Sequence, residues 1–212
     1  MLDQSVHLTG DTGEYFAQLK AIYLARIFGV DFSGKILDFG CGVGLLARFL
    51  RQHLPACKLD GYDPSASSIE QIPPGVYAKG KFTSRDDQLD AAYDLIVVAN
   101  VMHHVAVEKR RETISHLFSR LAPGGYVVAF EHNPGNPLTR WAVYTCPFDV
   151  GVALLWPEEL RKYFANAHLR VVRRDYITFF PRWFAWFRPL EPLLSWCPLG
   201  AQYAVVGRKA IL

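Results

Sequence analysis

The chain of 212 residues is half hydrophobic and one-fifth charged, with a net charge of +3, a balance that supports one domain with a full apolar core and excludes a disordered or collagen-like chain. Its four cysteines form no Cys-x-x-Cys pair, which argues against a zinc ribbon or a disulfide scaffold and predicts reduced thiols in the cytoplasm. The N-terminus lacks the pattern of a secretion signal and no apolar run approaches the roughly 20 residues of a membrane span, so we expect a soluble cytoplasmic protein.

Taken in chain order, the hydrophobic pattern predicts helices that alternate with strands. A helix is predicted over residues 14–29, where apolar residues recur at helical spacing and a glycine closes the segment. An apolar strand begins at Lys35 and runs into a glycine-rich loop. Further helices are predicted at 45–54, 107–121 and 157–167, and the one at 107–121 is expected to stop at Ala-Pro-Gly-Gly. Further strands are predicted at 56–63, 76–82, 93–100, 125–132, 170–180 and 200–209.

This alternation indicates the fold class. Strands that alternate with helices imply a parallel sheet with right-handed crossovers, and therefore an α/β, doubly wound Rossmann-like sheet. Because no repeat, low-complexity segment or linker interrupts the pattern, residues 1–212 are predicted to form a single domain. Its parts are an N-terminal helix at 14–30, a core at 35–180, an insertion or lid at 181–199 and a last strand at 200–209.

The first strand ends in a loop with three glycines, Gly40, Gly42 and Gly44. Glycines let the chain turn sharply and bring backbone N–H groups close to a ligand. A dinucleotide site would carry its third glycine at position 45, where this chain has Leu45. Asp38 precedes the loop and is poorly suited to a pyrophosphate but well suited to a cationic ligand. The loop therefore predicts a nucleoside site for a ligand that is not a dinucleotide.

The second strand ends at Asp63, nineteen residues after Gly44. A carboxylate at this position can accept hydrogen bonds from both hydroxyls of a ribose. A competing interpretation is a helix N-cap, since Asp-Pro-Ser can begin a helix.

Four segments in this order resemble the successive motifs of the class I S-adenosylmethionine (SAM)-dependent methyltransferases. They are ILDFGCGVG, GYDPS, YDLIVVANVMHHV and RLAPGGYVVAFEHNP, and the resemblance covers roughly residues 14–135. It implies the class I methyltransferase fold with an antiparallel last strand, SAM as the cofactor and S-adenosylhomocysteine as its product.

The resemblance also implies roles for individual residues. Asp38 and the loop from Gly40 through Cys41 and Gly42 to Gly44 would serve the methionine moiety, and Asp63, followed by Pro64, the ribose hydroxyls. Asn100 would face the methionyl end and the acceptor pocket. Apart from the resemblance, Tyr15 on the N-terminal helix is expected to close over the cofactor or, equally, to take part in ordinary helix packing.

The adenine end departs from the family pattern. The family often places an acidic residue after the third strand, whereas this chain reads GKFTSRDD. Thr83 or Ser84 is the expected replacement, and Asp86 or Asp87 is the alternative.

Three histidines follow carboxyl strand ends and are the candidate catalytic residues. They are His103 and His104 after the strand at 93–100 and His132 after the next strand. If the acceptor is a hydroxyl, a histidine is the usual general base. Because adjacent residues point in different directions, at most one of the first pair is expected to face the acceptor. The alternative is that the pair forms part of the wall and that the Glu131-His132-Asn133-Pro134 segment only braces its loop. No spacing typical of a metal site is present.

The insertion at 181–199 holds three of the five tryptophans, with arginines between them. Several of its apolar residues fall near one helical stripe, although Pro189 and Pro192 must break the helix. The stripe consists of Trp183, Trp186, Phe187, Leu190 and Leu194. Three interpretations are open: contact with a membrane surface at the inner face, a roof over an apolar acceptor pocket, and packing on the sheet. The first two favour an apolar or lipid-linked acceptor.

The predicted function is methyl transfer from SAM to a small, apolar or lipid-linked acceptor, most readily at oxygen. An NAD(P)-dependent oxidoreductase is disfavoured by Leu45 and by the lack of a Tyr-x-x-x-Lys pattern, and a non-catalytic SAM-binding protein is the third alternative. Nucleic acid is not an expected substrate, because the chain has Ala99-Asn100-Val101-Met102 in place of an Asn/Asp-Pro-Pro-Tyr signature.

Overall fold

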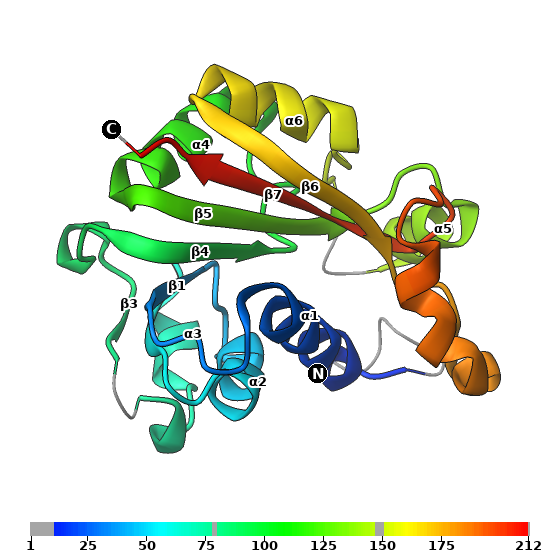
Figure 1. Cartoon of the computed structure of the whole chain (residues 1–212), viewed down its shortest axis with the longest axis horizontal. Coiled ribbons are helices and arrows are strands. Elements are labelled where there is room, and N and C mark those ends of the chain that lie inside the picture. The colour runs from blue at the N-terminus through cyan, green and yellow to red at the C-terminus, as the bar shows by residue number, and fades with distance from the viewer. Residues whose placement is uncertain (1–10, 78–79, 147–150, 212) are drawn as a thin grey trace.

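The computed structural model describes residues 11–77, 80–146 and 151–211, which form a seven-stranded sheet between two layers of helices (Figure 1). The strands are β1 (Lys35–Phe39), β2 (Lys58–Tyr62), β3 (Phe82–Thr83), β4 (Tyr93–Ala99), β5 (Leu121–His132), β6 (Leu169–Ile177) and β7 (Gln202–Lys209). The α-helices are α1 (Gly13–Phe28), α2 (Leu45–His53), α3 (Ala66–Glu70), α4 (Val107–Arg120), α5 (Pro137–Thr145) and α6 (Pro157–Asn166). Short 3-10 segments are η2 (Pro74–Val76), η3 (Asp86–Gln88) and η4 (Arg182–Leu194).

The strand order is β3-β2-β1-β4-β5-β7-β6. All pairs among β3, β2, β1, β4 and β5 are parallel, and β7 runs antiparallel to both β5 and β6. The predicted parallel sheet with an antiparallel last strand is therefore confirmed. The order reverses between β1 and β4, which places the ligand crevice of such a sheet beyond the carboxyl ends of these two strands.

Helices cover both faces of the sheet, as predicted (Figure 1). One face packs Leu95 and Val97 of β4 in a core with α1 and α2, and the other packs Ile96 and Val98 in a core with α4 and α6. Because alternate side chains of a strand point to opposite faces, an unbroken apolar run is what a strand buried on both faces requires.

The predicted third strand at 76–82 is wrong in its extent. Only Phe82 and Thr83 form β3, and the chain before them turns through η2 at Pro74–Val76. Proline lacks the N–H that a central ladder needs, so Pro73 and Pro74 favour this turn over a longer strand.

The stop after the helix at 107–121 also differs from the prediction. Ala-Pro-Gly-Gly lies within β5, which begins at Leu121, and the ladder with β4 shifts register between Tyr93 and Leu95. The positive φ of Gly124, 77°, accommodates this irregularity without the strain that a side chain would add.

Helix α5 was not predicted from the sequence. Asn136 caps it by accepting a hydrogen bond from the Thr139 amide at 3.0 Å, and Pro137 occupies its first turn. An N-cap asparagine followed by proline is a recognised helix start, so the signal was present in the sequence.

The insertion at 181–199 folds as the kinked segment η4, with non-helical backbone at Phe184. Trp183 and Trp186 are 67% and 71% exposed, and Leu190 is also exposed. The interpretation in which the stripe packs on the sheet is therefore wrong for these residues. Among the described residues, none of the helices has the length and apolar character that crossing a membrane requires.

Candidate functional site

The glycine loop after β1 is built from positive backbone angles. Gly40, Gly42 and Gly44 have φ values of 80°, 52° and 76°, a region that side-chain-bearing residues rarely adopt. A Cβ at Gly40 would lie 2.3 Å from Cγ2 of Val101, whereas a Cβ at Gly42 would meet no atom within 4 Å. The loop therefore packs tightly at Gly40 and leaves open space beside Gly42, where a ligand can approach the backbone.

Asp63 closes the loop from the neighbouring strand. Its Oδ2 accepts a hydrogen bond from the Gly42 amide at 2.9 Å, and its Oδ1 accepts one from the Ser65 amide, also at 2.9 Å. Ser65, and not Asp63, is the N-cap of α3, so the capping interpretation of Asp63 is wrong. A carboxylate oxygen has two lone pairs, so both oxygens retain capacity for ribose hydroxyls.

Three predicted cofactor residues carry buried polar atoms without a hydrogen-bond partner. The atoms are Oδ2 of Asp38, Oδ1 of Asn100 and the hydroxyl oxygen of Tyr15. Buried polar groups are nearly always paired, so the orphaned oxygens of Asp38 and Asn100, at the carboxyl ends of β1 and β4, indicate where a polar ligand is expected. The ammonium and hydroxyl groups of SAM are donors of the kind that these acceptors need, so the residues fit the cofactor that the motifs imply.

The electrostatics at Asp38 favour a cationic ligand. Burial and then the nearby charge of Asp63 raise the pKa of the Asp38 carboxyl to about 7. A cation bound beside it would lower this pKa again and stabilise the carboxylate.

Asn100 adopts a strained backbone conformation at the carboxyl end of β4. Its φ is 57°, and its amide donates to the Phe130 carbonyl of β5 at 2.8 Å. Asparagine adopts this left-handed region more readily than most residues with a side chain, and the place of Asn100 in the crevice stays a prediction.

Tyr15 lies in the first turn of α1 beneath the C-terminal insertion. Burial, followed by the charge of Glu191, raises the pKa of its hydroxyl to about 12. The guanidinium of Arg188 lies 4.0 Å from the ring centroid and is paired with Asp11 at 2.7 Å. The insertion is thereby attached to the helix that borders the cofactor crevice.

The adenine end is organised differently from the sequence prediction. The Thr83 hydroxyl donates to Oε1 of Gln88 at 2.5 Å and accepts from the Arg85 amide at 3.1 Å, so it is engaged within its own loop. Asp86 is paired with Arg120 and His116, and Asp87 with Arg85. Ser84, which is half-buried, is the other residue proposed in place of the family's acidic residue near the adenine. The assignment of Thr83 to the adenine end stays a prediction.

The candidate histidines gather where β4 and β5 end. The ring centroid of His103 lies 4.2 Å from that of His104 and 5.1 Å from that of His132. His103 is buried, His104 is exposed and His132 is half-buried. The structure thus brings together side chains that lie 28 or more residues apart in sequence.

Glu131 holds the buried member of this group. Its Oε2 lies 2.5 Å from Nδ1 of His103, and its Oε1 accepts from the amides of Val101 and Met102 at 3.1 and 2.7 Å. Since a carboxylate only accepts, the Nδ1 proton belongs to this bond, and Nε2 becomes the ring nitrogen that can accept a proton. Sequence reasoning noted Glu131 only as part of a polar segment and missed this pairing.

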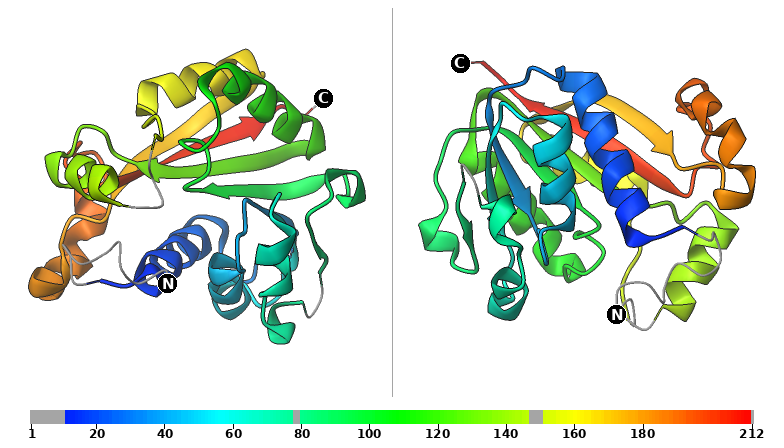
Figure 2. Two further views of the ribbon diagram at one scale, coloured as in Figure 1. Left: turned by 180° about the vertical axis from the view of Figure 1, so that it is seen from behind. Right: turned by 90° about the horizontal axis from the view of Figure 1, so that it is seen from below.

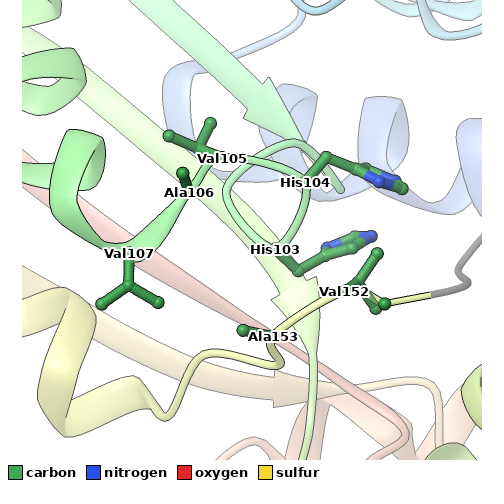
Figure 3. Close-up of a pocket in the computed structure, with 8 residues that line it drawn as sticks. His103, His104, Val105, Ala106, Val107, Val152 and Ala153 are labelled. Atoms are coloured by element: carbon green, nitrogen blue, oxygen red, sulfur yellow. The ribbon is translucent and has the colours of Figure 1, made fainter.

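His103 and His104 line one pocket of about 330 Å³ together with apolar residues (Figure 3). The other lining residues are Val105, Ala106, Val107, Gly151, Val152 and Ala153. Both histidines thus border this pocket, and which of them faces the acceptor stays a prediction. They lie in a turn closed by the bond from the His104 amide to the Val101 carbonyl, where neighbouring side chains do not alternate as they do in a strand.

The residues after His132 brace the site. Asn133 donates from Nδ2 to the carbonyls of Pro198 and Gly200 at 2.9 and 2.7 Å and accepts from the Gly135 amide at 2.9 Å. The bracing interpretation of this segment is confirmed for Asn133.

Lys20 is a buried cation that sequence reasoning missed. It is 3% exposed on α1, and its Nζ lies 6.0 Å from the Phe130 ring centroid. Burial lowers the pKa of its ammonium to about 8, and the charge of Glu131 partly opposes that change. The only sequence signal was a lysine on the apolar side of a helical pattern.

Comparison with known proteins agrees with this geometry. A family model described as a methyltransferase domain matches residues 13–182. The structure is similar to a SAM-dependent methyltransferase from Archaeoglobus fulgidus, with a TM-score of 0.69, 18% identity and coverage of 91% of this chain and 94% of that one. It is also similar to the N-methyltransferase NodS from Bradyrhizobium japonicum in complex with S-adenosyl-L-homocysteine, with a TM-score of 0.65, 18% identity and coverage of 98% and 93%.

Among curated proteins, a sterol 24-C-methyltransferase of Yarrowia lipolytica is 27% identical over 166 residues, which are 70% of this chain and 43% of that protein. The chain spans less than half the length of the curated relatives that it matches. The family match covers most of the chain. The chain therefore belongs to the methyltransferase-domain family, and its fold is that of the class I SAM-dependent methyltransferases.

Proposed function

We propose that the protein transfers a methyl group from SAM to a hydroxyl of a small, apolar or lipid-linked acceptor, with His103 as the general base and Glu131 as its positioning residue. The observation that carries this proposal is the 2.5 Å contact between Glu131 and Nδ1 of His103 at the carboxyl ends of β4 and β5. A methyl acceptor with a low-acidity proton needs a base, whereas an amine with a lone pair does not.

The cofactor side of the reaction rests on the residues of the glycine loop. Asp38, Asn100 and Tyr15 would hold the methionyl end, and Asp63 the ribose. When bound, SAM would supply an activated methyl group. A nucleophile attacks the methyl carbon in line with the carbon–sulfur bond, and S-adenosylhomocysteine leaves. The protein contributes chiefly by aligning the reacting atoms, because an in-line displacement depends above all on their proximity and orientation.

On the acceptor side, Glu131 fixes the tautomer and orientation of His103. Nε2 takes the hydroxyl proton as the acceptor oxygen forms its bond to the methyl carbon. Both side chains are buried, so the contact between Glu131 and Nδ1 of His103 is shielded from water. His104 and His132 are the other candidate bases, and their rings adjoin His103.

One observation supports an apolar acceptor: a curated relative is a sterol methyltransferase. A sterol 24-C-methyltransferase acts at carbon by its name, so the choice of oxygen rests on the histidine and glutamate pair alone.

The test is a matched pair of acceptors with one apolar skeleton, one bearing a hydroxyl and one an amine, with formation of S-adenosylhomocysteine as the measurement. We expect turnover of the hydroxyl compound and a loss of about 100-fold or more in His103→Gln. SAM binding, followed by thermal shift, should be unchanged in that variant. Turnover of the amine compound with a normal rate in His103→Gln would overturn the proposal.

A further inference from the structure

Two segments that are separate in sequence present an unusual number of exposed large apolar side chains at one end of the molecule. The segments are α5 and the insertion at 181–199, which lie side by side at the end of the sheet where β4 and β5 finish (Figures 1 and 2). We call these side chains the aromatic face; they are Leu138, Trp141, Tyr144, Trp183, Phe184, Trp186, Leu190, Leu193, Trp196 and Leu199.

Hydrogen bonds hold the two segments together. Asn136, the cap of α5, donates from Nδ2 to the Leu199 carbonyl at 2.7 Å, and Thr139 donates from its hydroxyl to the Ala201 carbonyl at 3.0 Å. Asn133 adds its two bonds to the carbonyls of Pro198 and Gly200. These hydrogen bonds to the carbonyls of residues 198–201 fix the C-terminal end of the insertion relative to α5.

The charge of this region has one sign. Within α5 and residues 181–199, the only acidic residue is Glu191, which is 8% exposed and accepts hydrogen bonds from the amides of Phe179 and Phe180. Arg140 and Arg182 are exposed. Within α5 and residues 181–199, the exposed side chains therefore include tryptophans and arginines, and the one carboxylate is buried.

We infer that the aromatic face docks the protein on an anionic lipid bilayer. Tryptophan and tyrosine favour the boundary between lipid headgroups and acyl chains, where an amphipathic ring is partly desolvated. Arginines near that boundary are attracted by the negative surface potential of anionic lipids. Large exposed apolar patches on soluble domains mark interaction sites, and a bilayer matches both the apolar and the charged part of this one.

A second copy of the chain matches the face less well. In a two-fold dimer the same surface meets itself, so Arg140 and Arg182 would face a surface whose one carboxylate within α5 and residues 181–199, Glu191, is buried. Like charges across an interface oppose association. An anionic bilayer supplies the missing negative charge.

The aromatic face also adjoins the acceptor side of the site. His132 ends β5 immediately before Asn133, whose side chain bonds the end of the insertion, and Arg188 joins the insertion to α1 beside Tyr15. A bilayer on this face would lie next to the crevice, so a lipid-linked acceptor could enter without crossing water. This last step rests on the proposed function, whereas docking itself does not.

Docking is tested by flotation of the protein with vesicles of phosphatidylcholine alone and of phosphatidylcholine with phosphatidylglycerol, in the absence of SAM and acceptor. We expect binding to the anionic vesicles and a blue shift of tryptophan fluorescence. The double variant Trp183→Ser with Trp186→Ser should bind more than about 10-fold more weakly, because two large aromatic rings are no longer transferred from water into the bilayer interface. Val30→Ser, an equally exposed apolar site on another part of the surface, is the matched control and should bind as the wild type does.

The charge component has its own pair of variants. Arg182→Glu should weaken binding to anionic vesicles by about 5-fold or more, since each basic residue near such a surface contributes about 1 kcal/mol. Lys162→Glu makes the same charge change on α6 and should have a smaller effect. Thermal shift with SAM, unchanged in all four variants, would show that each is folded.

The inference is overturned if the wild type binds neither vesicle, or if light scattering shows a dimer that the double tryptophan variant converts to a monomer. The second outcome would make the face an interface between copies. Because no turnover is measured, failure here is separate from failure of the proposed methyl transfer, which is assayed with detergent-dispersed acceptors.

Discussion

Nδ1 of His103 lies 2.5 Å from Oε2 of Glu131, and both side chains are almost wholly buried, at 2% and 0% exposure. Glu131 also accepts two amide N–H groups from the turn that carries His103. One carboxylate therefore sets both the backbone path of the turn and the orientation of the imidazole.

Glu131→Gln tests this double role. The amide can still accept hydrogen bonds through its oxygen but cannot compensate an imidazolium, so we expect kcat to fall about 10-fold or more while the KM for SAM stays near the wild-type value. The pH profile of kcat should also change, because the carboxylate that faces Nδ1 of His103 is gone. A variant with an unaltered profile and only a lower melting temperature would show that Glu131 is merely structural.

The pKa of Asp38 predicts a pH dependence of cofactor binding. Because this pKa is about 7 in the free protein, the carboxyl gains a proton as the pH falls from 8 to 6 and loses its attraction for a cationic ligand. The affinity for SAM should fall over this window, approaching about 10-fold per pH unit below the pKa. Titration calorimetry at several pH values measures it, and Asp38→Asn should bind weakly with a flat profile.

Stability of the free protein should change in the opposite sense. The pKa of Asp38 is raised from its ordinary value of 3.8 to about 7, so the folded state holds this proton more tightly than the unfolded state does. The free energy of unfolding should decrease as the pH rises from about 4 to about 7 through this group. Asp38→Asn should remove that contribution, and thermal melts of the two proteins across this window provide the comparison.

Alanine substitutions at two glycines distinguish the space that a ligand would occupy from the space that the fold itself fills. Gly42→Ala places a Cβ in open space at a positive φ, so we expect a stability loss of only about 1 kcal/mol but a strong loss of SAM affinity. Gly40→Ala adds a 2.3 Å approach to Val101 and should destabilise the fold more. If Gly42→Ala bound SAM normally, the cofactor would not occupy the space beside this residue.

Lys20→Met should stabilise the protein at pH 7. Burial lowers the pKa of Lys20 from 10.5 to about 8, so the unfolded state binds its proton more tightly and stability rises with pH between about 8 and 10.5. Replacing the ammonium by an apolar side chain of similar length removes this cost and flattens that rise. Urea melts at pH 7 and pH 10 measure both effects. A less stable variant would indicate that the ammonium has a compensating partner in the fold.

The sequence alone determined those parts of this protein that local chemistry encodes. Apolar periodicity located the strands of the parallel sheet, since a strand buried on both faces needs an unbroken apolar run. The three glycines, Asp38 and Asp63 indicated the nucleoside site, because a loop with positive φ angles tolerates few other residues.

Only the tertiary structure decided how distant groups are paired. Glu131 at the end of β5 contacts His103 after β4, and the Thr83 hydroxyl is hydrogen-bonded to Gln88 within its own loop. Lys20 is buried beside Phe130. The tertiary structure also left Trp183 and Trp186 exposed, although their spacing fits a packed helical stripe equally well. Periodicity records which side chains are apolar, whereas the arrangement of the neighbouring elements decides which of them are covered.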